Sequence, residues 1–242
     1  MSKDKLSGCR AKSRCIVELR YVPLVQAFDK RGALLETLNA AFKDKMPHWR
    51  AENVAIRILN DPDATTREIA VDHKRYLLAY EDPGTVQEFL DDGKRVIQLV
   101  HSVLPDLWEG INRIGVRFIS VLKADGYGDF ADIHAKVMST FFAPRIPLSL
   151  AITDCRAVLE HETGRMLVGP ARRGEAWLRE VFSTPDAHMP EIGFGLDTDN
   201  YVVNPKIGSV AEVITAFTTV YEQTLATEYE VAAALGLRSK NG

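Results

Sequence analysis

The sequence predicts an α+β protein in which a mostly antiparallel sheet carries long helices on one face. Ile16–Tyr21 and Arg113–Phe118 alternate apolar with charged residues, which is typical of strands with a single buried face. The strands of a parallel sheet covered on both faces would instead be continuously apolar. The chain has 242 residues, of which 46% are hydrophobic, so it can bury a core and is too apolar for a disordered protein.

The first half begins with a segment that is too charged to fold alone. Residues 1–14 hold Lys3, Lys5, Arg10, Lys12 and Arg14 against Asp4, so we expect a disordered basic tail there. Apolar spacing, turn residues and prolines then predict the following order: a strand from Cys15 to Val22, a helix over Lys30–Lys45, strands over Val54–Leu59 and Glu68–Glu81 (split near His73–Arg75), and a long helix over Thr85–Trp108.

The second half repeats this order of elements. It is expected to contain a strand over Arg113–Lys123, a helix over Asp129–Phe142, strands over Leu148–Glu160, Arg165–Gly169 and Ile192–Val203, and a final helix over Ser209–Leu235. Residues 18–22 and 115–119 occupy matching places. Residues 15–242 therefore form a single α+β domain, and the match is either chance or an internal duplication with halves 15–110 and 111–242.

Charge and cysteine content predict a cytoplasmic protein. The formal net charge of −3 gives no overall attraction to nucleic acid or to an anionic membrane. Three cysteines cannot form a closed disulfide framework, which favours a reducing compartment. The longest uncharged run, Val96–Pro105, is too short to cross a bilayer, and no secretory signal is visible. The common nucleotide-loop, serine-hydrolase and zinc-protease motifs do not occur, so we expect no cofactor and no metal.

One segment resembles a known family. Ile111–Ser120 is similar to the Arg-Ile-Gly-Leu-Arg-Tyr-Ile-Asn signature of a sporadically distributed, uncharacterised bacterial family of about 250 residues, and departs from it at Phe118 and Ser120. That family also opens with an extended strand and closes with a long helix. The resemblance implies a class without a known activity, and the sporadic distribution fits defence-associated or mobile genes.

Strand alternation also predicts a set of arginines on the face that the helices leave open. Arg20, Arg57, Arg117 and Arg156 would converge there and could bind phosphates or carboxylates. The alternative, which we favour, is an ion-paired surface that binds nothing. For Arg117 we expect partial burial and a bond to an acidic side chain, with Glu18 or Asp154 as partner, or to a bound anion.

Two functions follow from these observations. The first is a non-enzymatic binding or interaction module, whose partner would be a second copy of the chain, through a sheet edge or the last helix, or another protein. A nucleic-acid partner would use the basic tail and the arginines. The alternative is a hydrolase or small-ligand enzyme with an unrecognised acid–histidine site, for which the residues to test are Asp72, His73, Asp154 and Asp197.

Overall fold

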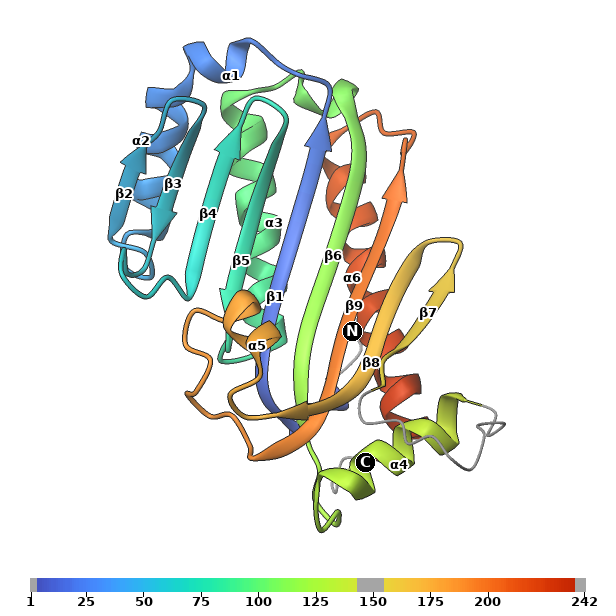
Figure 1. Cartoon of the computed structure of the whole chain (residues 1–242). Helices are drawn as coiled ribbons and strands as arrows, with labels where there is room; N and C mark the ends of the chain where they lie inside the picture. The colour runs from blue at the N-terminus through green and yellow to red at the C-terminus, as the bar shows by residue number, and fades with distance from the viewer. Residues whose placement is uncertain (1–3, 143–154, 238–242) are drawn as a thin grey trace.

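The computed structural model describes residues 4–142 and 155–237, and within them the chain forms one nine-stranded sheet (Figure 1). The strands are β1 (Arg10–Tyr21), β2 (His48–Ala51), β3 (Ala55–Leu59), β4 (Arg67–Asp72), β5 (Arg75–Glu81), β6 (Ile111–Lys123), β7 (Ala157–His161), β8 (Gly164–Arg172) and β9 (Ile192–Val203). Every adjacent pair is antiparallel, so the predicted antiparallel α+β class is confirmed.

Most of the helical residues lie behind the sheet in the view of Figure 1. The α-helices are α1 (Gln26–Asp29), α2 (Arg31–Phe42), α3 (Val86–Val103), α4 (Phe130–Phe141), α5 (Ala176–Val181) and α6 (Val210–Ala234). Helices α2, α3 and α6 are seen through the sheet, whereas the short helix α5, which the sequence did not predict, lies in front of it. The helix predicted to reach Trp108 ends at Val103, because Pro105 cannot continue it, and a 3₁₀ turn follows over Leu107–Gly110.

The strand order is β2-β3-β4-β5-β1-β6-β9-β8-β7, with the antiparallel pair β1–β6 at the centre. On one side of this pair β1 is followed outward by β5, β4 and β3, and on the other side β6 is followed by β9, β8 and β7. A long helix follows each series in the chain: α3 comes after β5, and α6 comes after β9. The order is therefore the same on both sides over four strands, and the edge strand β2 beyond β3 has no counterpart.

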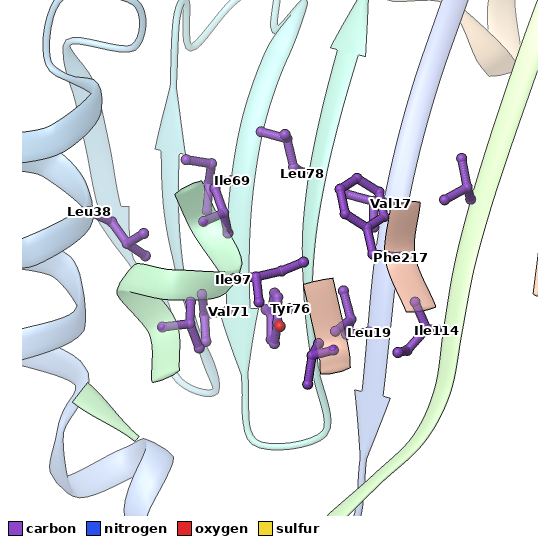
Figure 2. Close-up of a cluster of buried hydrophobic side chains, with 14 of the residues drawn as sticks. Val17, Leu19, Leu38, Ile69, Val71, Tyr76, Leu78, Ile97, Ile114 and Phe217 are labelled. Carbon is purple, nitrogen blue, oxygen red and sulfur yellow. The ribbon is translucent and has the colours of Figure 1, made fainter. Parts of the chain in front are cut away.

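The larger hydrophobic core lies between strands β1, β3, β4, β5 and β6 and helices α2, α3 and α6 (Figure 2). Leu19 of β1 and Ile114 of β6 are fully buried there, as their alternation with charged residues predicted. Helices α3 and α6 approach closely at Gly93, where an added Cβ would lie 2.7 Å from Cζ of Phe217. Only glycine fits at this crossing.

A second, smaller core fills the other end of the molecule. It contains Leu122 of β6, Phe194 of β9 and Leu235 just after α6, together with side chains of α4 and β8. Both cores use β6 and α6, so the same long elements pass from one core to the other. What separates the two cores is a layer of buried polar side chains, which leads to the candidate site.

The structure corrects the predicted tail and tests the predicted strand Leu148–Glu160 only in part. Residues 4–14 are not a disordered tail: β1 begins at Arg10, Leu6 is 1% exposed, and the basic side chains of Arg10 and Lys12 are paired with carboxylates. The strand predicted from Leu148 begins only at Ala157 among the described residues, and residues 148–154 lie outside them.

Candidate functional site

Five buried polar side chains separate the two cores between β6, β9 and α6. They are all fully shielded from solvent and are called the polar layer below: Ser120, Thr198, Asn200, Thr224 and Glu228. Asn200 donates from Nδ2 to Thr224 Oγ1 at 3.3 Å. Thr198 Oγ1 and Asn200 Oδ1 have no hydrogen-bond partner among the residues that the structure describes. Buried polar atoms of this kind are costly, so the layer is a specialised feature of the interior.

The negative charge of Glu228 in this layer is balanced by Arg10, the first residue of β1. Glu228 accepts hydrogen bonds from Ser120 Oγ, at 2.8 Å, and from the guanidinium of Arg10, which also binds Asp4. Burial disfavours the charged guanidinium, but the carboxylates of Glu228 and Asp4 outweigh it and raise the pKa of Arg10 above its ordinary value. Arg10, which composition predicts to lie in a disordered tail, therefore neutralises the buried carboxylate of Glu228.

A second buried cation lies two residues along β1. The ammonium of Lys12 is completely buried and contacts Glu81, at 2.8 Å, Asp82, at 2.8 Å, and Thr184 Oγ1, at 3.0 Å. Burial opposes the charge on Glu81, yet the bonds from Lys12, from Thr184 and from the Ser183 backbone lower its pKa below the ordinary value. Lys12 thus ties β1 to the end of β5 and to the loop that follows α5.

Arg10 and Lys12 form part of the wall of a pocket of about 570 Å³, called the Arg10 pocket below. It lies where β1 begins and β5 ends, and its wall includes the N-terminal segment, the turn that starts α3 and the ring of Tyr221 from α6. The turn is fixed by Asp82, whose φ is +45°, and by Thr85, whose side chain accepts from the Glu88 backbone N–H at 3.0 Å. Pockets of this size bind small organic molecules.

On the sheet face where arginines were predicted, the arginines of the central strands form ion pairs. Glu18 of β1 accepts bonds from Arg20 at 2.6 Å, from Arg75 at 2.7 Å and from Arg113 at 3.3 Å. Arg113 also grips both oxygens of Asp199, at 3.0 and 2.9 Å. Each arginine at this centre has a carboxylate partner.

Arg117 donates two hydrogen bonds to Asp197, at 2.8 and 2.7 Å, and its side chain is 44% exposed. The bond to Asp197 raises the pKa of the Arg117 guanidinium above its ordinary value. The predicted bond to an acidic side chain is confirmed, but the partner is neither Glu18 nor Asp154. β9 pairs with β6 and brings Asp197 alongside, whereas Asp154 lies outside the described residues.

The four predicted anion-binding arginines do not converge. Arg20 and Arg117 lie on the central strands, whereas Arg57 is on β3, three strands from β1, where it contacts Glu52 and Glu68. Arg156 precedes β7, and its guanidinium lies over the ring of Trp177 in α5, 4.9 Å from the ring centroid. Strand spacing alone puts about 14 Å between Arg57 and Arg20.

The alternative acid–histidine set is not brought together either. Asp72 and His73 form the turn between β4 and β5, where Asp72 accepts from the backbone of residues 74 and 75 and His73 stacks on Phe28. Asp197 lies on β9, with three strands between β4 and β9. Asp154 lies outside the described residues. Asp72 and Asp197 are therefore too far apart to act on one substrate atom.

Sequence reasoning missed the residues of the Arg10 pocket. Arg10 and Lys12 were assigned to a tail, although Arg10–Cys15 already alternates charged with small or apolar residues. Glu228 gave a second signal, because it follows Tyr221 and Thr224 at helical spacing, where the apolar stripe of α6 predicts a hydrophobic residue. A charged residue on a buried stripe requires a buried partner.

Comparisons with known proteins add no family. Neither a family model nor a curated protein sequence matches this chain. Within residues 4–142 and 155–237, no helix is long and apolar enough to cross a membrane. No group of three or more His, Cys, Asp or Glu side chains in the same ranges is arranged to hold a metal ion.

Proposed function

We propose that this protein is a non-enzymatic binding module that takes a small ligand in the Arg10 pocket. The observation that carries the proposal is the coincidence of a cavity of about 570 Å³ with two buried basic side chains of β1, Arg10 and Lys12. Small-molecule sites are concave and mostly apolar, with a few fixed polar groups. Arg10 and Lys12 are held by ion pairs with Glu228 and Glu81, so the wall is organised before a ligand arrives.

We also infer that the halves 15–110 and 111–242 descend from one duplicated unit. The inference is supported by the junctions that precede the two long helices. Asp82 and Asn204 have nearly the same left-handed φ, +45° and +46°, each is followed by proline, and each donates its backbone N–H to the neighbouring central strand. Thr85 and Ser209 then cap α3 and α6 in the same way, each accepting from a glutamate three residues later.

The proposed duplication allows the region around Glu228 to be compared with its counterpart in the other half. Leu104 follows Thr85 by the same number of residues as Glu228 follows Ser209, so the two are counterparts. Leu104 is fully buried in the larger core, whereas Glu228 is equally buried and binds Arg10. The buried Arg10–Glu228 pair and the cavity of about 570 Å³ that Arg10 lines lie at the Glu228 end, which favours that end as the site of function.

The experiment is a fragment screen by ligand-observed NMR on the full chain. Ser7 is exposed at the rim of the pocket, so Ser7→Trp introduces an indole that occupies the cavity without disturbing the core. Fragments that bind the wild type should lose binding to Ser7→Trp and keep it with Ser102→Trp, an exposed serine on α3 outside the pocket wall. Equal binding to all three proteins would refute the proposal.

A further inference from the structure

The basic side chains in the wall of the Arg10 pocket have few donors left for a ligand. A lysine ammonium has three N–H donors, and Lys12 contacts three acceptors: Glu81, Asp82 and Thr184. Arg10 directs its Nε and both of its terminal nitrogens to other acceptors, a hydroxyl and two carboxylates. These bonds leave two of the five N–H donors of Arg10 and none of the three of Lys12, so an anionic ligand would find few donors although the site contains two cations.

The ion-paired cluster that Arg10 and Lys12 form carries a negative surplus. The two cations contact four carboxylates: Asp4 and Asp82, which lie in the pocket wall together with His188, and Glu81 and Glu228, which do not belong to the wall. The N-terminus of α3 borders the pocket and contributes about half a positive charge, which does not reverse the sign of a surplus of two. A negative surplus in a largely buried site is relieved when a cation binds.

The charged acceptors in the pocket wall are two carboxylates, and both can accept further hydrogen bonds. Asp82 accepts from the Ser13 backbone N–H and from Lys12, one bond at each oxygen, and its side chain is 31% exposed. Asp4 likewise accepts one bond at each oxygen. Each carboxylate oxygen has two lone pairs, so both residues can still accept hydrogen bonds from a ligand.

From these three observations we propose that the ligand of the Arg10 pocket is a small organic cation, a primary ammonium on an apolar body. This inference rests on the proposed function and names the ligand class. The ammonium donates to Asp82 and Asp4, and the apolar body lies against Pro83, Val86 and the ring of Tyr221. The aromatic face of the tyrosine favours the cationic end as well.

The test compares three probes of the same shape: phenethylammonium, the neutral phenethyl alcohol and the anionic 3-phenylpropionate. Each is titrated into the full chain at low salt, and binding is followed by NMR chemical-shift changes. We expect the ammonium to bind at least about tenfold more tightly than the alcohol, and the carboxylate to bind least. Tighter binding of the carboxylate or of the alcohol would overturn the inference and leave the proposed pocket function standing.

Asp82→Asn isolates the charge, because asparagine tolerates the left-handed backbone and already occupies the counterpart position 204. It should weaken ammonium binding about tenfold and leave alcohol binding unchanged. Glu160→Gln, which removes an exposed charge on β7, is the matched control and should change neither. Asp4→Asn replaces Asp82→Asn as the test if the latter does not fold.

The outcomes separate the two proposals. If the ammonium binds but Asp82→Asn and Asp4→Asn leave its affinity unchanged, the cation does not lie where we place it and the inference fails. If none of the three probes binds while other fragments fill the pocket, the ligand class is wrong and the function survives. If nothing binds in the pocket at all, both proposals fail.

Discussion

His101 should make the stability of this protein depend on pH between neutrality and pH 4. The imidazole lies in the last turn of α3, 3% exposed, with Nε2 3.4 Å from the hydroxyl of Tyr76. Its Nδ1 has no partner among the described residues. Burial lowers the pKa of His101 from 6.5 to about 4, because no carboxylate is placed to compensate the charged form.

The sign follows from where the proton binds. Between pH 6.5 and pH 4 the unfolded chain is protonated at His101 and the folded chain is not, so the stability that the neutral imidazole contributes is present above pH 6.5 and is lost as the pH falls to 4. With these two values the loss is about 2 kcal/mol at pH 5 and approaches about 3 kcal/mol below pH 4. Carboxylates add their own acid sensitivity, so the effect must be measured as a difference between variants.

The assay is urea unfolding at pH 7 and pH 5, followed by tryptophan fluorescence, for the wild type, His101→Gln and Ser102→Ala. Glutamine is neutral at both pH values and still reaches the Tyr76 hydroxyl. The wild type and the exposed control Ser102→Ala should each lose about 2 kcal/mol more between pH 7 and pH 5 than His101→Gln. An identical pH response in all three proteins would show that the imidazole is protonated inside the fold, and the reasoning from burial would be wrong.

Three further outcomes are expected from equilibrium unfolding. Gly93→Ala forces a methyl group against Phe217 and should cost about 1–3 kcal/mol, whereas the same change at the unobstructed Gly32 should cost nothing; a neutral Gly93→Ala would mean that the helices can separate. Glu228→Leu removes one of the two carboxylates that pair with the buried guanidinium of Arg10 and should cost about 3 kcal/mol, and a stabilised variant would contradict this. Arg117→Lys loses a bidentate bond at a half-exposed site and should cost at most about 0.5 kcal/mol, so a larger loss would indicate a role beyond this pair.

The sheet could be predicted wherever alternation was strong, and not where it was absent. Ile16–Tyr21 and Arg113–Phe118 lie within the two central strands, because a charged residue on every second position leaves one apolar face. Strand β2 gave no signal, since all four of its residues are exposed and periodicity reports burial. Helix α5 is too short for a helical period to be recognised.

The candidate site was hidden for a different reason. Arg10 and Lys12 can be buried only because Glu228 and Glu81, which are distant in sequence, meet them in the folded chain. Composition counts charges along the chain and assigns such a segment to solvent, whereas burial depends on pairs formed across the fold. The prediction for Arg20 and Arg117 had a different fault. Their alternation along the strands was correct, but both form ion pairs with acidic residues, Glu18 on β1 and Asp197 on β9.

The energetics of the Arg10–Glu228 pair argue that it is kept for binding rather than for folding. Replacing a buried ion pair by apolar residues of similar volume is often neutral or stabilising, by about 1–4 kcal/mol. Under the proposed duplication the counterpart of Glu228 is Leu104, the residue directly after α3, which joins the larger core. An apolar pair would therefore fit the frame and would merge the two cores that the polar layer now divides. What it would not supply is a fixed, charged wall beside a cavity of about 570 Å³. The ligand that we propose for the Arg10 pocket would account for the stability forgone here, because Glu228 holds Arg10, and Arg10 in turn holds Asp4 in the wall.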